Sequence, residues 1–290
     1  MQEDVTFVSD GLKLSGRLTL PEGYKQGERR AAVIVLHGFG SNKNSGNVRI
    51  PCEMLSERGY VTLGFDMRGC GDSEGEKGRV ICMEQVADTQ SAISYLLTRA
   101  DIDPNRIALL GSSFGAAVAI FTGSVDARVA AVVSSGGWGN GERKFRGQHP
   151  TPEQWAKFTA MLEEGKRHRE RTGQSLMVPR YEIVPIPQEL RGHVVPGSIQ
   201  TFPAETAQSM FDFKAEEVVA QMAPRPLLLL HSSADSVTPT EQSIGIFKQA
   251  GQPCDLHLFA ETDHFMFADT NTRVRSVLFD WLDKYFPARA

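Results

Sequence analysis

The chain has 290 residues and a formal net charge of −4, with 41% hydrophobic and 23% charged residues. This composition is typical of a folded globular protein and excludes a disordered or fibrous chain. The acidic balance gives no reason to expect nucleic acid or an anionic membrane as a partner. No apolar run is long enough for a membrane span, and the N-terminus has no secretory signal. The four cysteines show neither C-x-x-C spacing nor a disulfide framework, so we expect reduced thiols in a cytoplasmic protein.

The first predicted element is a β-hairpin, Val5–Ser9 and Leu12–Leu20, around the turn Asp10-Gly11. Short apolar runs then alternate with helical stretches, which indicates a mostly parallel sheet with helices on both faces. The predicted strands are Ala32–Leu36, Val61–Asp66, Arg106–Leu110, Val129–Ser134, Pro226–His231 and Leu256–Ala260. The predicted helices are Pro51–Arg58, Met83–Arg99, Phe114–Gly123, Thr240–Ala250 and Thr272–Phe286.

This alternation stops between residues 136 and 213, where charges are dense and prolines frequent. A structureless loop of that length is unusual in a compact domain. We therefore predict an inserted cap, residues 136–213, between the two parts of a catalytic domain, residues 1–135 and 214–290. Within the cap, Thr151 as N-cap and Pro152 at the first helical position predict a helix that runs to about Arg171. Tyr181–Pro187 is predicted as an edge strand or a plain loop.

The pentapeptide Gly111-Ser112-Ser113-Phe114-Gly115 matches the G-x-S-x-G pattern of a nucleophile elbow. It lies between a predicted strand and a predicted helix, where the pattern requires a very sharp turn. Glycines two positions before and after Ser113 let the strand and helix pass without a clash, which favours Ser113 over Ser112. The helix N-terminus favours negative charge, so we predict that Ser113 is a nucleophile. The alternative is a glycine- and serine-rich turn without chemical function.

Two residues near the end of the chain supply the acid and base that such a serine needs. With this elbow, they follow the serine in the order Asp or Glu, then His. Asp235 and His264 each come after a predicted strand, which places them at the same rim of a parallel sheet as Ser113. We predict that His264 takes the proton from Ser113 and that Asp235 orients the imidazole.

Other acids and histidines compete for these roles. Asp263 and Glu261 are alternative acids, but Asp263 adjoins His264, and neighbouring side chains on a loop rarely face each other. The other histidines are interpreted as His257 inside a strand, His231 ahead of the acid in the chain, and His149, His168 and His193 in the cap. No two histidines have metal-ligand spacing, so we expect no metal and no cofactor.

His37-Gly38-Phe39-Gly40 follows the first apolar strand. A tetrahedral oxyanion needs a second backbone N–H besides that of the residue after the nucleophile. We predict the main-chain N–H groups of Phe39 and Phe114 as the two donors of an oxyanion hole. The alternative is a plain turn in which Phe39 only packs.

Together these features resemble the α/β-hydrolase superfamily over roughly residues 5–135 and 215–287. The segment from Asp66 to Gly75 also resembles the D-x-R-G-x-G-x-S turn of that family, whose role is mainly structural, so Arg68 and Asp72 are not placed in the chemistry. The nearest similarities are to feruloyl and cinnamoyl esterases and to dienelactone-hydrolase-like and prolyl-oligopeptidase-like catalytic domains. The resemblance implies a doubly wound, mostly parallel sheet.

The resemblance also implies a substrate pocket between the cap and the sheet rim. The side chains predicted to line it are Trp138, Trp155, Tyr181 and Phe202, with Phe158, Met210 and Phe211 as further candidates. Packing inside the cap is the alternative for each of them. The basic run Lys166–Arg171 is interpreted as a solvated helix face, with attraction of an anionic substrate as the alternative.

We therefore expect a serine hydrolase that cleaves a carboxylic ester of a small-molecule substrate through an acyl-enzyme. Amide or peptide-bond hydrolysis and carbon–carbon bond cleavage by the same three residues are alternatives. A non-catalytic member of the fold that binds a small molecule is a further alternative. The expected partner is the small ester, without nucleic acid or membrane, and a homodimer is left open.

Overall fold

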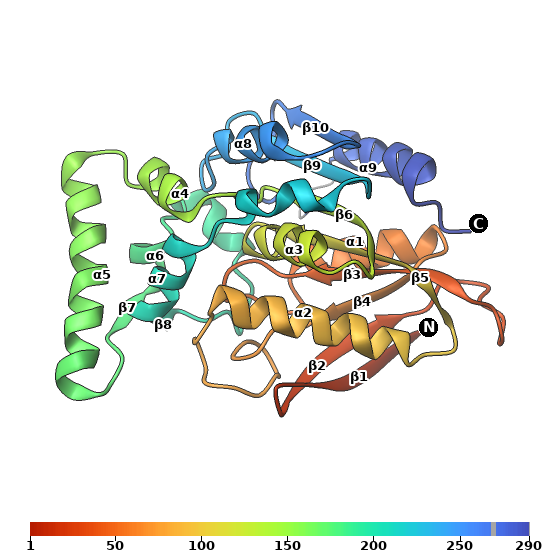
Figure 1. Cartoon of the computed structure of the whole chain (residues 1–290), viewed down its shortest axis with the longest axis horizontal. Helices are drawn as coiled ribbons and strands as arrows, with labels where there is room; N and C mark the ends of the chain where they lie inside the picture. The colour runs from red at the N-terminus through yellow and green to blue at the C-terminus, as the bar shows by residue number, and fades with distance from the viewer. Residues whose placement is uncertain (268–270, 290) are drawn as a thin grey trace.

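The computed structural model describes residues 1–267 and 271–289. Its centre is an eight-stranded sheet with the order β1-β2-β4-β3-β5-β6-β9-β10 (Figure 1). β1 and β2 form the predicted hairpin, β2 pairs antiparallel with β4, and all later neighbours are parallel. The strands are β1 (Gln2–Ser9), β2 (Leu12–Thr19), β3 (Arg30–Leu36), β4 (Val61–Phe65), β5 (Ile102–Ser112), β6 (Val129–Ser135), β9 (Leu227–Ser232) and β10 (Cys254–Phe259). The predicted doubly wound sheet is confirmed.

Each central strand contributes to two apolar cores, one on each face of the sheet. In β3, Ala32, Ile34 and Leu36 belong to one core, and the alternate residues Ala31, Val33 and Val35 belong to the other. The helices α2 (Cys82–Leu97), α3 (Phe114–Val125) and α8 (Glu241–Gln249) cover the first face, and α1 (Gly46–Glu57) and α9 (Thr272–Tyr285) cover the second. Burial on both faces explains why these strands are hydrophobic at nearly every position.

Three predicted element starts differ from the structure by three residues or more. β1 begins at Gln2 rather than at Val5. α1 begins at Gly46 rather than at Pro51, so the proline lies inside the helix. An interior proline costs about 3 kcal/mol, and the burial of Val48, Met54 and Leu55 against the sheet offsets that cost. β5 begins at Ile102 rather than at Arg106, because the first part of this strand already pairs with the start of β3.

Residues 136–213, which we call the cap, form their own layer at one end of the sheet (Figure 1). Its elements are α4 (Gly141–Gln148), α5 (Pro152–Thr172), β7 (Met177–Pro179), α6 (Arg180–Ile183), η1 (Gln188–His193), β8 (Thr201–Pro203) and α7 (Ala204–Asp212). α5 starts as predicted, with a capping box between Thr151 and Gln154, and ends at Gly173 in the left-handed region. Two short 3₁₀ helices, η2 (Ala215–Glu217) and η3 (Val219–Met222), lead back to β9.

The prediction of an edge strand or plain loop at Tyr181–Pro187 is wrong for residues 181–183, whereas residues 184–187 form a plain loop. Residues 181–183 belong to the short helix α6, and the small antiparallel pair lies instead between β7 and β8. The buried side chain of Arg180 donates to the main-chain carbonyl oxygens of Phe39 and Gly40, which lie in the part of the chain outside the cap (the core domain), and to that of Ile199 within the cap.

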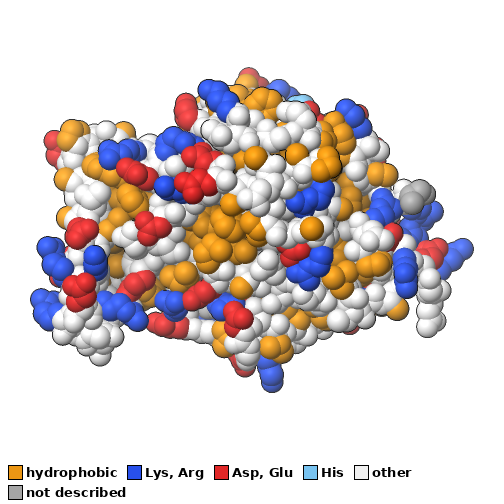
Figure 2. Space-filling view, viewed as in Figure 1, with side chains coloured by type: hydrophobic (Ala, Val, Ile, Leu, Met, Phe, Trp, Pro, Cys, Tyr) orange, Lys and Arg blue, Asp and Glu red, His pale blue; other side chains and the backbone are white. Residues whose placement is uncertain are grey.

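The cap surface carries charges of both signs, as the left side of Figure 2 shows. In the predicted basic run on α5, Arg167 pairs with Glu164, and Arg169 pairs with Glu205. These pairs favour the interpretation of a solvated helix face. No helix in the described part of the chain is long and apolar enough to cross a membrane.

Candidate active site

Ser113 lies between the last residue of β5 and the first residue of α3. Its φ of 55° and ψ of −116° place a non-glycine residue in a strained conformation, as the sharp turn requires. Gly111 and Gly115 make the turn possible. A Cβ on Gly111 would collide with the carbonyl oxygen of Gly115, and a Cβ on Gly115 would lie 2.5 Å from the carbonyl oxygen of His37.

The structure brings Ser113, His264 and Asp235 together. Ser113 Oγ is 2.8 Å from His264 Nε2, and His264 Nδ1 is 2.9 Å from Oδ2 and 3.1 Å from Oδ1 of Asp235. Asp235 follows β9 and His264 follows β10, so the carboxyl ends of parallel strands converge on the serine. Since Asp235 accepts at Nδ1, the neutral imidazole carries its proton there, and Nε2 is free to accept from the serine hydroxyl.

Asp235 is held as a carboxylate by a dense set of donors. The N–H groups of Val237 and Thr238 bond to its Oδ1 at 2.8 and 2.7 Å. Burial alone would raise the pKa of Asp235, but the charge of His264 and hydrogen bonds from His231 and His264 outweigh it. The pKa therefore lies well below its usual range, and the group is ionised at neutral pH.

His231 is a second histidine on the same carboxylate. Its Nε2 lies 3.3 Å from Asp235 Oδ2 and 3.0 Å from the carbonyl oxygen of Thr238, and its Nδ1 lies 2.6 Å from Ser243 Oγ. Two acceptors at Nε2 place the proton on that nitrogen, so His231 donates to Asp235. Sequence reasoning missed this contact because it excluded His231 only as a base. The four-residue spacing of His231 and Asp235 across the end of a strand was the available signal.

The carboxylate of the alternative acid Asp263 accepts the backbone N–H of His264 at 2.7 Å, whereas the imidazole is bonded to Asp235. The Asp263 carboxylate also accepts the N–H of Ser236 at 2.9 Å and the Ser236 hydroxyl at 2.8 Å. It therefore stabilises the loop that carries Asp235.

Phe39 lines the same cavity as Ser113, and Phe114 directly follows Ser113 in the chain. Phe114 is the first residue of α3, so its N–H has no acceptor within the helix. Gly38 packs directly against the serine, because a Cβ there would lie 3.6 Å from Ser113 Cβ. His37 Nδ1 bonds the Gly38 carbonyl oxygen at 2.8 Å, while His37 Nε2 accepts the N–H of Met67 at 3.1 Å. These bonds fix the peptide plane that contains the Phe39 N–H.

Arg180 joins the cap to this loop. Its Nη1 donates to the Phe39 carbonyl oxygen at 2.8 Å, its Nη2 to that of Gly40 at 2.9 Å, and its Nε to that of Ile199 at 2.7 Å. The guanidinium also lies 5.3 Å from the ring centre of Phe39. Burial lowers the pKa of Arg180 to about 10, so the cation persists at neutral pH. The sequence contained no pattern that pointed to this residue.

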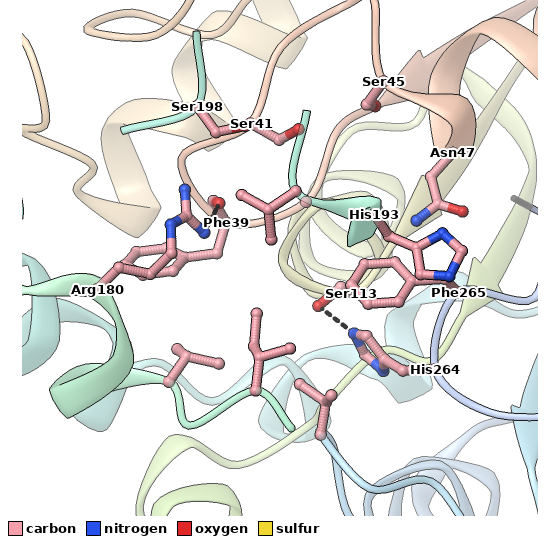
Figure 3. A pocket seen from close by; sticks show the side chains of 15 residues that line it. Phe39, Ser41, Ser45, Asn47, Ser113, Arg180, His193, Ser198, His264 and Phe265 are labelled. Atoms are coloured by element: carbon pink, nitrogen blue, oxygen red, sulfur yellow. Dashed lines mark hydrogen bonds between the residues drawn. The ribbon is translucent and has the colours of Figure 1, made fainter. Parts of the chain in front are cut away.

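A cavity of about 50 Å³ opens at Ser113 and His264, between the core domain and the cap (Figure 3). One set of lining side chains is apolar: Phe39, Val184, Ile186, Val194, Val237 and Phe265. The other set is polar: Ser41, Ser45, Asn47, Arg180, His193 and Ser198. The described lining contains no aspartate or glutamate.

The four aromatic residues predicted to contact substrate do not line this cavity in the described structure, so that prediction is wrong for the space beside Ser113. Trp138 is buried edge-on against Phe213. Phe202 is buried and stacks on Phe39 with ring centres 4.1 Å apart, so it supports the loop from behind.

The other two aromatic residues pack within the cap. Trp155 lies under Arg146, whose guanidinium is 4.1 Å from the ring centre. Tyr181 lies under Arg191 at 3.9 Å and borders a separate hollow near α5. Trp138 and Phe202 belong to the apolar core on one face of the sheet, and Trp155 and Tyr181 pack against it as partly buried residues, so packing rather than exposure to the cavity places all four rings.

The Asp66 turn has structural partners only. Asp66 pairs with Lys43 at 2.7 Å, and Arg68 pairs with Asp88 at 2.6 Å, all in buried positions. Asp72 reaches the same lysine from the surface at 2.6 Å. None of the three is among the described residues that line the cavity.

A serine held in a strained strand-to-helix turn, at the carboxyl ends of a mostly parallel sheet, is the arrangement of the α/β hydrolases. The chain is a member of that class. Residues 27–271 match the model of the family described as serine aminopeptidase, S33, and the chain belongs to this family.

Proteins of similar length share either sequence or fold with this chain. The chain is 27% identical to an uncharacterized 31.7 kDa protein of Escherichia coli, over 96% of this chain and 97% of the relative. The crystal structure of the α/β hydrolase GrgF from Penicillium sp. superposes with a TM-score of 0.81 at 20% identity, covering 98% and 99% of the two chains. Est1E from Butyrivibrio proteoclasticus, solved with bound ferulic acid, gives 0.69 at 19% identity, covering 97% and 98%. These structural likenesses show the shared fold.

Proposed function

We propose that this α/β hydrolase is a serine esterase that cleaves a small carboxylic ester through an acyl-enzyme. One observation carries the proposal: the hydrogen-bonded series Ser113–His264–Asp235, with 2.8 and 2.9 Å links, opens onto a cavity. In this mechanism the serine is the nucleophile, the histidine the base and the aspartate the group that orients it.

Each half of the reaction moves one proton through His264. Ser113 Oγ bonds to the ester carbon while its proton passes to His264 Nε2, and the N–H groups of Phe39 and Phe114 bind the resulting oxyanion. The carbon–oxygen bond to the alcohol then breaks, and the imidazolium returns its proton to that oxygen. Water repeats the sequence on the acyl-enzyme, which releases the acid and restores Ser113.

Amide hydrolysis is a second candidate because the family description names an aminopeptidase. A substrate with a free N-terminal ammonium needs a carboxylate to bind it, and a buried unpaired charge is costly. The described lining of the cavity holds Arg180 and no acidic residue, which disfavours an ammonium group there. Ester cleavage therefore takes precedence.

Covalent labelling with a fluorophosphonate probe tests the nucleophile. Ser113→Ala should abolish labelling, whereas Ser112→Ala, which alters the adjacent buried serine, should retain it. Both variants should keep the melting temperature within a few degrees of the wild type. An unlabelled wild type, or labelling that survives Ser113→Ala, would exclude the proposed nucleophile.

The type of bond is tested with p-nitrophenyl esters and the matching p-nitroanilides of short acyl groups. We expect the esters to be hydrolysed and the anilides to be hydrolysed more slowly, since an amine leaving group depends more strongly on protonation by His264. The small cavity predicts that acetyl and butyryl esters exceed long-chain esters. Equal ester and anilide rates would refute the preference for esters.

A further inference from the structure

The cavity at Ser113 is lined by a cationic side chain, Arg180, which positions the Phe39 loop but contacts no part of the substrate in the proposed hydrolysis. Arg180 is only 3% exposed and lines the cavity. A guanidinium has five N–H donors, and three of those of Arg180 are accounted for by the carbonyl oxygens of Phe39, Gly40 and Ile199. The remaining donors have no acceptor, and the cation has no carboxylate partner, among the described residues.

Two buried hydroxyl groups border the same cavity without a hydrogen-bond partner in the described structure. Ser198 is 9% exposed and Ser45 is 5% exposed, and both line the cavity. Ser45 stands at the N-cap position of α1, yet its side chain does not bond to the first turn of that helix. Buried hydroxyls normally find a partner. Ser198 lies on the Arg180 side of the cavity and Ser45 lies near Asn47 (Figure 3), so the unused hydroxyl of Ser198 with the buried cation indicates a place for an acceptor-rich ligand.

Figure 3 shows where Arg180 lies relative to the nucleophile and the base. Arg180 and Ser198 lie on one side of the Ser113 hydroxyl, and His264 lies on the other. The leaving alcohol takes its proton from His264 and therefore occupies the side of the imidazole. The acyl group consequently extends toward Arg180.

We propose that the natural substrate is an ester whose short acyl group carries a carboxylate, bound by Arg180 with the hydroxyl group of Ser198. The inference rests on the proposed esterase function. A carboxylate accepts charge-assisted hydrogen bonds from a guanidinium and from hydroxyls at once. It would also neutralise a buried positive charge in a lining without acidic residues.

The exposed basic run on α5 does not provide this recognition. Arg167 is paired with Glu164 at the surface, and it is not among the described residues that line the cavity. It therefore offers a control cation in the same cap.

The test compares two ethyl esters of the same size. Ethyl hydrogen succinate carries the carboxylate, and ethyl 4-methylpentanoate replaces it with an isopropyl group. With acid release followed in a pH-stat, we expect kcat/KM for the succinate ester to be at least tenfold higher, as a charged hydrogen bond supplies about tenfold or more. The preference should be lost in Arg180→Met, reduced severalfold in Ser198→Ala and unchanged in Arg167→Met.

The readout is the ratio of kcat/KM for the succinate ester to kcat/KM for the 4-methylpentanoate ester. A ratio is needed because Arg180→Met also loosens the loop at Phe39 and lowers both rates. A second measurement needs no turnover: free succinate should slow fluorophosphonate labelling of Ser113 more than 4-methylpentanoate does. Suppose that Ser113 is labelled by the fluorophosphonate, but ethyl 4-methylpentanoate and 4-methylpentanoate are preferred over, or equal to, the succinate ester and succinate. The inference is then overturned, and the esterase proposal stands. If Ser113 is neither labelled nor active, the proposed function itself has failed.

Discussion

Asp235→Asn removes one charge from the site without changing its shape, and we predict that it lowers kcat by about four orders of magnitude. Oδ1 of Asp235 accepts the backbone N–H groups of Val237 and Thr238, whereas Oδ2 faces Nδ1 of His264 at 2.9 Å and Nε2 of His231 at 3.3 Å. The two backbone donors therefore hold the oxygen of an asparagine amide. Its NH2 group then points at the two histidines.

An amide NH2 donates to His264 Nδ1 and so selects the imidazole tautomer with its proton on Nε2. That nitrogen lies 2.8 Å from Ser113 Oγ and could no longer accept the serine proton. Four orders of magnitude correspond to about 5.4 kcal/mol of transition-state stabilisation.

Stability should change in a specific pH window. Because the pKa of Asp235 is lowered on folding, the ionised group stabilises the wild type above its unfolded pKa of about 3.9. This contribution is lost as the pH falls through the folded pKa. The difference in melting temperature between wild type and Asp235→Asn should therefore shrink below about pH 4.

The assay is hydrolysis of p-nitrophenyl acetate together with the rate of fluorophosphonate labelling at neutral pH. Asp263→Asn is the matched control, since its carboxylate bonds to Ser236 and should cost only a few-fold in kcat. Retention of more than a tenth of wild-type kcat in Asp235→Asn would refute the role of Asp235. A comparable loss in Asp263→Asn would do the same.

Three further substitutions test the surroundings of the site. His231→Gln removes the imidazole N–H that lies 3.3 Å from Asp235, so kcat for p-nitrophenyl acetate should fall about tenfold, as expected for loss of one charged hydrogen bond; an unchanged kcat would refute that support. Gly40→Ala places a methyl group into the Phe202 ring at a φ of 50°, so the melting temperature and the labelling rate should both fall, and a wild-type melting temperature would contradict the predicted clash. Burial lowers the pKa of Lys144 to about 7. Between about pH 7 and 10 the unfolded chain therefore binds more protons than the folded chain, and the free energy of unfolding of the wild type rises with pH. Lys144→Met should therefore raise the melting temperature at pH 7 and flatten that rise, whereas a lower melting temperature at pH 7 would show that the cation is stabilising.

The site could be predicted where it depends on the ends of strands. Ser113 and Asp235 follow continuous apolar runs, His264 follows the mixed strand β10, and parallel strands bring their carboxyl ends to one rim. Local patterns also succeeded where a few neighbouring residues decide the outcome. The capping box at Thr151 is such a case.

The cap could not be predicted at the same level, because its contacts join distant residues through main-chain atoms. The acceptors of Arg180 are carbonyl groups, which every residue possesses, so no side-chain pattern marks them. The aromatic side chains of Trp138 and Phe202 suit a binding pocket and an apolar core equally well in sequence, and only packing decided between them. The contact between His231 and Asp235 likewise needed the end of β9 to be known.

The bond from Arg180 to Phe39 spans 141 positions of the chain. The loop that we propose to bind the oxyanion is therefore built from the first fifth of the protein but is completed by an insertion synthesised much later. The cap is consequently not an exchangeable module. Grafting a cap from a relative would alter turnover as well as substrate choice, unless the graft also supplied a cation that donates to the carbonyl groups of Phe39 and Gly40.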